Sequence, residues 1–110
     1  MNGLRFSILM PVYNGAAYIS ETLRSVLFQS FTDFEIIIVD DNSTDNTFDV
    51  VRSFKDQRIK FYKNFTNLGY SGNLKECNKK SSGDIIYLMG QDDILGEDAL
   101  LNTFNAFQIS

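Results

Sequence analysis

Short, almost wholly apolar runs constrain the fold of this chain most strongly. The clearest, residues 35–40, ends at Asp40, and Asp41 adds a second carboxylate directly after it. Near-continuous apolar character over so few residues is typical of a strand buried on both faces of a parallel sheet. A second run, residues 85–89, leads into the acidic segment 90–93. Because ligands bind beyond the carboxyl ends of strands in open α/β sheets, the two acidic ends are predicted to share one rim.

Helical patterns alternate with these runs. The patterns predict strands at residues 6–10, 35–40, 58–62 and 84–89, and helices at about 17–29, 43–54, 71–81 and 97–107. Four strand–helix units favour one α/β domain over residues 1–110, a three-layer α/β/α sandwich with a mainly parallel sheet of about four strands. Residues 58–62 alternate apolar and polar, which places them nearer the sheet edge.

Three local details are also predicted. Pro11 has no N–H to donate, so it is expected to end the pairing of the first strand. Ser43 or Thr44 is expected to cap the second helix, because hydroxyls accept hydrogen bonds from free amides at a helix start. Phe48 and Val51 are expected to face inward from that helix.

Composition excludes several classes of protein. The net charge of −4 argues against a nucleic-acid surface, which is usually basic. The chain has no histidine, so any metal would be bound by carboxylates. The single Cys77 rules out an internal disulfide and suits a reducing compartment. No apolar run reaches the roughly 18 residues of a membrane span and no signal segment is apparent, so a cytoplasmic location is expected.

Two strand ends carry candidate nucleotide contacts. The ring of Tyr13 could cover a flat base, although a half-buried loop aromatic would give the same pattern. Asp41 could accept the imide N–H of uracil or bond a ribose hydroxyl, with Asp40 beside it. Turn and capping chemistry is the alternative for such aspartates, but it does not require two of them directly after a buried strand.

The later motifs indicate metal and phosphate chemistry. Asp92 and Asp93 repel each other unless water or a cation neutralises them. Mg²⁺ or Mn²⁺ would bind one or two such carboxylates together with substrate phosphates; a solvated acidic turn is the alternative. Around Gly69, the segment 67–73 either lets main-chain amides approach a phosphate or forms an ordinary flexible loop.

Taken in order, these motifs resemble the nucleotide-sugar-binding part of a family 2 glycosyltransferase with the GT-A fold. The matching segments are residues 7–14, 25–31, 35–45, 67–69, 83–87, 91–93 and 97–100. They cover nearly all of the chain, and four ordered motifs are far more specific than one. The resemblance implies transfer of a sugar, with inversion, from a nucleotide-diphosphate sugar (UDP favoured) to a glycan or lipid-linked acceptor.

The resemblance also implies roles for matching residues. Tyr13 would lie beside the base, with Pro11 shaping that strand end. Asp41 would bind the base N–H, Asp40 would support the site, and Gly69 would approach the nucleotide. Replacing Asp41 is therefore expected to weaken nucleotide binding with little loss of fold.

Asp92 and Asp93 match the acidic motif that holds ribose, pyrophosphate and a Mn²⁺ or Mg²⁺ ion in this family. Two departures stand out. Many relatives carry Asp where Gly90 stands, so the metal motif is a reduced form. Many also carry Arg-Asn at the two positions that end in Lys75, so nucleotide binding near the phosphates is expected to involve Asn73 or Lys75 instead.

Members of this family are longer than the present chain. The missing half would supply the acceptor site and the catalytic base, so this fragment is expected to be inactive alone. In the parent protein, other segments could bring it to the inner face of the membrane. Apolar surface left open is expected to cause self-association, and the candidate residues are Phe54, Phe61, Phe104 and Phe107.

Two alternatives stay open on the sequence alone. A nucleotidyltransferase also uses acidic metal sites on an α/β sheet, but its glycine-rich, lysine-bearing phosphate loop is not apparent after the first strand. A signalling receiver domain is doubly wound and acidic, but it needs an acidic pair at the first strand end, where this chain has Pro11, Val12 and Tyr13. Metal-dependent nucleotide binding and acyl-phosphate labelling separate these functions.

Overall fold

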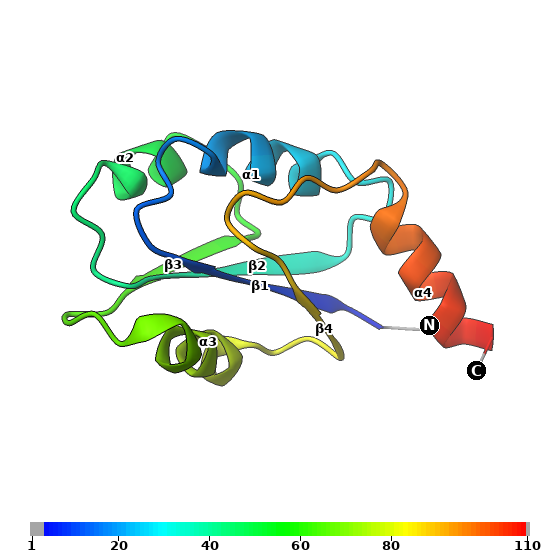
Figure 1. Ribbon diagram of the computed structural model, residues 1–110. Coiled ribbons are helices and arrows are strands. Elements are labelled where there is room, and N and C mark those ends of the chain that lie inside the picture. The colour runs from blue at the N-terminus through cyan, green and yellow to red at the C-terminus, as the bar shows by residue number, and fades with distance from the viewer. Residues whose placement is uncertain (1–3, 110) are drawn as a thin grey trace.

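The computed structural model describes residues 4–109, in which strands and helices alternate (Figure 1). The elements are β1 (Phe6–Val12), α1 (Ile19–Leu27), β2 (Phe34–Asp40), α2 (Thr47–Arg52), β3 (Ile59–Lys63), α3 (Gly69–Lys80), β4 (Ile85–Leu88) and α4 (Ala99–Ile109). The strands form one sheet in the order β3-β2-β1-β4, and every neighbouring pair is parallel. The predicted α/β fold is confirmed, and β3 lies at an edge as its alternating residues indicated.

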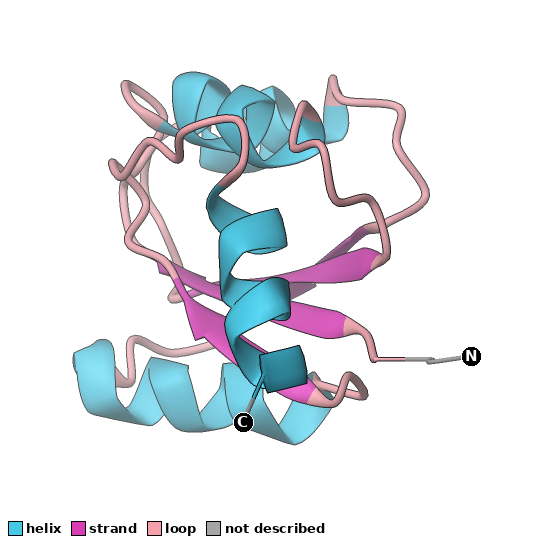
Figure 2. Ribbon diagram, turned by 90° about the vertical axis from the view of Figure 1, so that its right-hand side faces the viewer, coloured by secondary structure: helices cyan, strands magenta, loops and turns pink. Residues whose placement is uncertain are grey.

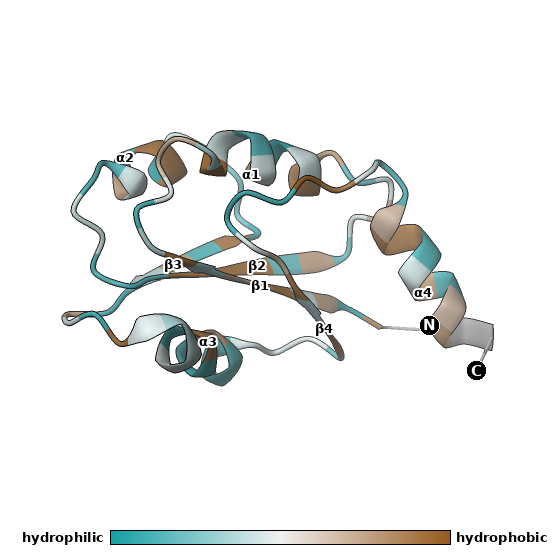
Figure 3. Cartoon of the chain, viewed as in Figure 1, coloured by the Kyte–Doolittle hydropathy of each residue, from teal (hydrophilic) through white to brown (hydrophobic). Residues whose placement is uncertain are grey.

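Three layers build the domain. Helices α1 and α2 cover one face of the sheet and α3 covers the other, while α4 crosses the end of the sheet at which β1 begins (Figures 1 and 2). β1 and β2 are buried along their whole length and are mainly hydrophobic (Figure 3). Within the described part of the chain, each helix is too short or too polar to cross a membrane.

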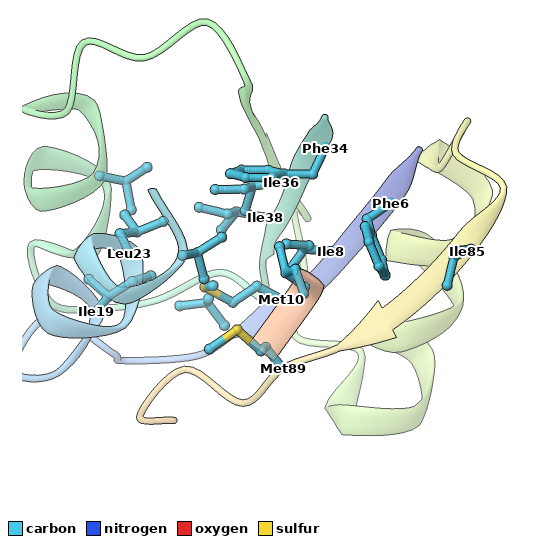
Figure 4. Close-up of a cluster of buried hydrophobic side chains, with 14 residues drawn as sticks. Phe6, Ile8, Met10, Ile19, Leu23, Phe34, Ile36, Ile38, Ile85 and Met89 are labelled. Atoms are coloured by element: carbon cyan, nitrogen blue, oxygen red, sulfur yellow. The ribbon is translucent and has the colours of Figure 1, made fainter. Parts of the chain in front are cut away.

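Side-chain alternation along the two central strands divides the core. The larger cluster joins even-numbered residues of β1 and β2 to the inner face of α1; it includes Phe6, Ile8, Met10, Ile36, Ile38, Ile19 and Leu23 (Figure 4). A smaller cluster forms on the opposite face, where Leu9, Ile37 and Val39 pack with Cys77 of α3. Because successive side chains of a strand point to opposite faces, each central strand supplies both clusters.

One odd-numbered position of β2 carries a buried carboxylate. Glu35 accepts hydrogen bonds from Ser7 Oγ at 2.6 Å, Lys60 Nζ at 2.8 Å, and the Ser82 main-chain N–H at 2.7 Å. Burial alone would raise the pKa of Glu35, but hydrogen bonds from Lys60, Ser7 and Ser82 outweigh it and lower the pKa to about 2. Glu35 therefore ties β1, β3 and the loop after α3 to β2.

β1 is longer than predicted, because Pro11 does not end its pairing. The strand continues to Val12, with Pro11 in register with Val39 of β2. On the other side, Leu9 O accepts the Met89 N–H at 2.9 Å, so odd-numbered residues of β1 turn their main-chain groups towards β4. The pairing with β4 ends at Leu9. The missing N–H of Pro11 thus faces a position at which the ladder has already finished.

α2 begins later than predicted, at Thr47, and its N-cap residue Asn46 makes no side-chain capping bond. Ser43 and Thr44 bond instead within the loops that precede the helix. Val51 is buried as expected, but Phe48 is 48% exposed, which contradicts its predicted inward position. The ring of Phe48 lies against edge strand β3 rather than in the core, because this short helix covers the margin of the sheet.

Most aromatic residues expected on open surface are packed instead. Phe54, Phe61 and Phe104 are partly buried against the larger core cluster. Phe104 lies there because α4 closes the end of the sheet and brings its ring to 4.7 Å from that of Phe31. Phe107 is 51% exposed, as expected.

Candidate functional site

A pocket of about 420 Å³ opens where β1 and β2 end. Four places contribute: the end of β1, the residue after β2, the start of α3 and the loop after β4. The lining residues are Pro11, Val12, Tyr13, Asp41, Asn67, Gly69, Tyr70, Asn73, Gly90, Gln91 and Asp92. All predicted site residues except Asp40, Lys75 and Asp93 therefore line one cavity.

Parallel pairing brings Tyr13 and Asp41 to this cavity. β1 and β2 are in register at Val12 and Asp40, so the next residue of each strand leaves the sheet at the same level. The Asp41 N–H donates to Val12 O at 2.8 Å, which extends the pairing by one step. Tyr13 is 47% exposed, whereas Asp41 is 2% exposed. The pocket thus combines an accessible ring with a hidden carboxylate.

The Asp41 carboxylate also organises the start of α3. Oδ1 accepts the Leu68 N–H at 2.7 Å and the Asn64 side-chain amide at 2.9 Å, and Oδ2 accepts the Gly69 N–H at 2.9 Å. Gly69 has a φ of +80°, a conformation that favours glycine. These bonds contradict the expectation that Asp41 could be replaced with little loss of fold. The same carboxylate serves the fold and faces the pocket.

Asn73 and Lys75, the two residues expected near the phosphates, do not direct a free polar group into the pocket. Asn73 is 2% exposed; its amide donates to Val39 O at 2.9 Å and its Oδ1 accepts from Asn64 at 3.0 Å. Its polar atoms therefore join α3 to β2, although its side chain borders the pocket. Lys75 lines a different groove, between α3 and β4, with Ile86 and Leu88. The expectation for Lys75 is thus wrong for this chain, because its helix turns it away from the pocket.

Asp40 lies outside the pocket lining and supports the loops behind it. Its carboxylate accepts both the main-chain N–H and the hydroxyl of Ser43. The Ser43 oxygen in turn accepts the Asn14 N–H at 2.8 Å, and Asn14 Oδ1 accepts the Thr44 N–H at 2.8 Å. The loop after β1 and the loop after β2 are therefore interlocked through Asp40, Ser43 and Asn14.

A second carboxylate nearby tightens the same pair of loops. Asp45 accepts the main-chain N–H groups of Ala16 and Thr47, both at 3.1 Å, and the Thr47 hydroxyl. Burial by itself would raise the pKa of Asp45, but these hydrogen bonds outweigh it and lower the pKa. Asp45 therefore stays ionised in the folded chain and fixes the backbone behind Tyr13.

The acidic segment after β4 forms a tight turn. Asp93 Oδ2 accepts the Gly90 N–H at 2.8 Å, while Asp92 is exposed and lines the pocket. A Cβ atom on Gly90 would lie 3.1 Å from Asp93 Oδ2 and 3.5 Å from Asp92 Oδ1, so both carboxylates surround this glycine. Within residues 4–109, no three or more His, Cys, Asp or Glu side chains are grouped so that they could hold a metal ion.

Several lining residues were not singled out from the sequence. Gln91 and Asn67 enter the pocket beside the predicted residues, and Tyr70 supplies a second, 64% exposed aromatic ring. Tyr70 lies next to Gly69 in the glycine motif, so its position in the sequence was a usable signal. Gln91 likewise lies next to Asp92 in the matching segment 91–93, but its bond to Tyr13 depends on contacts far along the chain.

Comparison with known proteins identifies the family. The Glycosyl transferase family 2 model matches residues 7–109. An uncharacterized glycosyltransferase of Haemophilus influenzae is 35% identical over 107 residues, which make up 96% of this chain and 43% of that protein. The Escherichia coli protein WfgD, a UDP-Glc:alpha-D-GlcNAc-diphosphoundecaprenol beta-1,3-glucosyltransferase, is 38% identical over 94 residues, or 86% of this chain and 37% of that protein.

The fold leads to the same family. The crystal structure of Staphylococcus aureus TarS 1-349 in complex with UDP matches with a TM-score of 0.91 and 28% identity over 96% of this chain and 32% of that chain. The present chain thus spans less than half the length of these relatives. The expected GT-A fold is confirmed, and the chain belongs to glycosyl transferase family 2.

Proposed function

We propose that this chain binds the nucleotide of a UDP-sugar and forms the donor-binding half of an enzyme that transfers the sugar to a glycan or lipid-linked acceptor. The observation that carries the proposal is the single cavity that gathers Tyr13, Asp41 and Asp92 at the carboxyl ends of the strands. The UDP bound in the TarS crystal structure supports UDP as the nucleotide. The name of WfgD, which specifies a UDP-Glc donor and a diphosphoundecaprenol-linked acceptor, supports a UDP-sugar donor and a lipid-linked acceptor.

The base would lie between Tyr13 and Asp41. A carboxylate offers about four lone-pair positions, and Asn64, Leu68 and Gly69 occupy three of those on Asp41. The remaining position suits the imide N–H of uracil, while the exposed Tyr13 ring offers a flat apolar surface. Cytosine has no hydrogen on the corresponding ring nitrogen, so this arrangement favours uridine over cytidine.

The diphosphate would require a cation. Among the described lining residues the charged side chains are Asp41 and Asp92, and none is lysine or arginine. Asp92, with Asp93 next to it, fits a Mn²⁺ or Mg²⁺ ion that takes its other ligands from the diphosphate and water. Such an ion stabilises the negative charge on the departing nucleoside diphosphate.

Calorimetric titration of the chain with UDP tests the proposal. We expect Mn²⁺ to strengthen UDP binding about tenfold relative to EDTA, as expected when one charged contact is gained. Asp92→Asn should remove that gain. Asp49→Asn is the matched control, because Asp49 is an exposed aspartate that pairs with Arg52 on α2 and does not line the pocket.

Each outcome has a defined meaning. Absence of UDP binding under both conditions would overturn the proposed function. Equal affinity with Mn²⁺ and with EDTA would remove the metal from it. Stronger binding of CDP than of UDP would contradict the role given to Asp41.

A further inference from the structure

Gln91 connects two walls of the pocket that the sheet itself does not join. The Tyr13 N–H donates to Gln91 Oε1 at 2.8 Å. Gln91 is held in turn, since Thr22 Oγ1 of α1 donates to its main-chain oxygen at 2.7 Å. A Cβ atom on Gly15 would lie 3.0 Å from Oε1, so the loop after β1 packs closely against this amide.

The bond between the Tyr13 N–H and Gln91 lies just beyond the point at which β1 and β4 cease to pair. The pairing of β1 with β4 ends at Leu9 and Leu88, and the Met89 N–H makes one further bond to Leu9 O. Beyond that point β1 and the segment after β4 are no longer paired in the sheet, and they lead to Tyr13 and to Asp92 respectively. The Gln91 side chain spans this gap, because it starts on the acidic turn and ends on the Tyr13 backbone.

We propose that Gln91 is a positioning residue that fixes the separation between the Tyr13 ring and the Asp92 carboxylate. This inference rests on the proposed function and deepens it, because a nucleoside diphosphate must contact both walls at once, its base at Tyr13 and its diphosphate near Asp92. Gln91 acts through Tyr13 and requires no contact of its own with the ligand. Only its side-chain oxygen is needed, as an acceptor for the Tyr13 N–H.

Loss of that acceptor has a distinctive consequence. The Tyr13 N–H lies at an exposed position, so in a variant without the Gln91 oxygen it can bond water at little cost to stability. The loop after β1 would then be held less firmly, and ligand binding would have to order it again. Gln91→Leu should therefore weaken UDP binding with Mn²⁺ about fivefold while the unfolding temperature changes little.

A matched glutamine elsewhere provides the control. Gln29 is 3% exposed; its amide donates to Ser25 O and Gly96 O, and its Oε1 accepts the Leu100 N–H at 3.0 Å. Gln29 does not line the pocket. Gln29→Leu should lower the unfolding temperature and leave the UDP affinity of the folded protein unchanged, which is the reverse of the result expected for Gln91→Leu.

A double-mutant cycle tests the route of the effect. If Gln91 acts through Tyr13, Gln91→Leu should cause no further loss of UDP affinity in a Tyr13→Ala background. Gln91→Glu keeps an oxygen acceptor, so its affinity for uncharged uridine, measured by NMR titration, should equal that of the wild type. If Gln91→Leu does not fold, Gln91→Ala, which also removes the acceptor oxygen, takes its place in the cycle.

The failures are distinguishable. Absence of UDP binding by the wild type would overturn the proposed function and this inference with it. Normal UDP binding by both wild type and Gln91→Leu would overturn the inference alone. Fully additive losses in the double-mutant cycle, or weakened uridine binding by Gln91→Glu, would also overturn it.

Discussion

The two ends of the sheet each bury a carboxylate, and they use it differently. Where the strands begin, Glu35 accepts hydrogen bonds from β1, from β3 and from the loop after α3. Where the strands end, Asp41 accepts hydrogen bonds from one segment, which leads into α3, and borders the open pocket. The two residues are equally hidden, with 1% of Glu35 and 2% of Asp41 exposed.

Burial therefore does not distinguish the structural carboxylate Glu35 from the proposed site carboxylate Asp41, but the donors around them differ. Two hydrogen bonds from Ser82, one from Ser7 and one from the Lys60 ammonium fill the acceptor positions of Glu35 and offset its charge. The donors to Asp41 are Asn64, Leu68 and Gly69, all neutral, and three hydrogen bonds leave one of about four acceptor positions unused. The charge of Asp41 is thus not offset by a cationic side chain among these donors, and Asp41 borders the pocket.

Among the substitutions that test this comparison, Glu35→Ala should cause the largest loss of unfolding free energy. The substitution leaves the buried Ser7 hydroxyl and the Ser82 N–H without an acceptor and Lys60 without its partner, which should cost about 4 kcal/mol of unfolding free energy. Urea denaturation of the variant and the wild type measures this loss. An unchanged unfolding free energy would show that Glu35 is not structural. The milder Glu35→Gln, once folded, should bind UDP as the wild type does.

Lowering the pH should destabilise the fold through Glu35, at the end where the strands begin. The pKa of Glu35, about 2 in the folded chain, lies below its ordinary value of 4.5. Its contribution is therefore complete above pH 4.5 and is lost as the pH falls from 4.5 towards 2, by about 3 kcal/mol in total. Denaturant unfolding of wild type and Glu35→Gln across this range measures the difference. Equal acid sensitivity of the two proteins would count against it.

Asp41→Ala should show a mixed effect. Its hydrogen bonds to the start of α3 predict a loss of about 2 kcal/mol of unfolding free energy, and the contact with the base that we propose for it predicts a loss of about tenfold in UDP affinity. Denaturation and calorimetry measure the two losses separately. Asp41→Asn serves as the control that keeps one acceptor oxygen. A loss of stability without a loss of affinity would make Asp41 equivalent to Glu35 and remove the contrast between the two ends.

Gly90→Asp should give the smallest effect and the opposite sign. A third carboxylate in this turn would join Asp92 and Asp93, so the Mn²⁺ enhancement of UDP binding should rise about threefold. Gly90→Ala controls for the added Cβ atom, which would lie 3.1 Å from Asp93 Oδ2. A gain in Gly90→Ala as large as that in Gly90→Asp would assign the change to turn geometry rather than to charge.

Much of this architecture could be predicted from local pattern. Apolar runs such as 35–40 identified buried strands, and the rule that parallel strands end at one rim brought Tyr13, Asp41 and Asp92 together before any coordinates. Such predictions succeed because the side chains of a strand themselves indicate whether the strand is buried. The prediction for Pro11 failed for the opposite reason, because whether its missing N–H matters depends on how far β4 extends.

The rest of the site depends on long-range contacts. The donors to Asp41 include the main-chain N–H groups of Leu68 and Gly69, and main-chain donors are common to almost every residue type. Gln91 and Tyr13 are 78 positions apart, and only the folded topology makes them neighbours. Neither relation can be deduced from residue type or spacing. Both depend on hydrogen bonds that form only in the folded chain.

The interlocked loops also bear on chemical ageing. Asn14-Gly15 is a sequence prone to deamidation, which begins when the glycine nitrogen attacks the asparagine side-chain carbonyl. Here the Gly15 N–H donates to Thr47 Oγ1 at 3.1 Å, and Asn14 Oδ1 accepts the Thr44 N–H at 2.8 Å. Both reacting groups are therefore committed to partners across the loops. Deamidation at this dipeptide should proceed chiefly from opened molecules, and its rate would report how often the rim of the pocket unfolds.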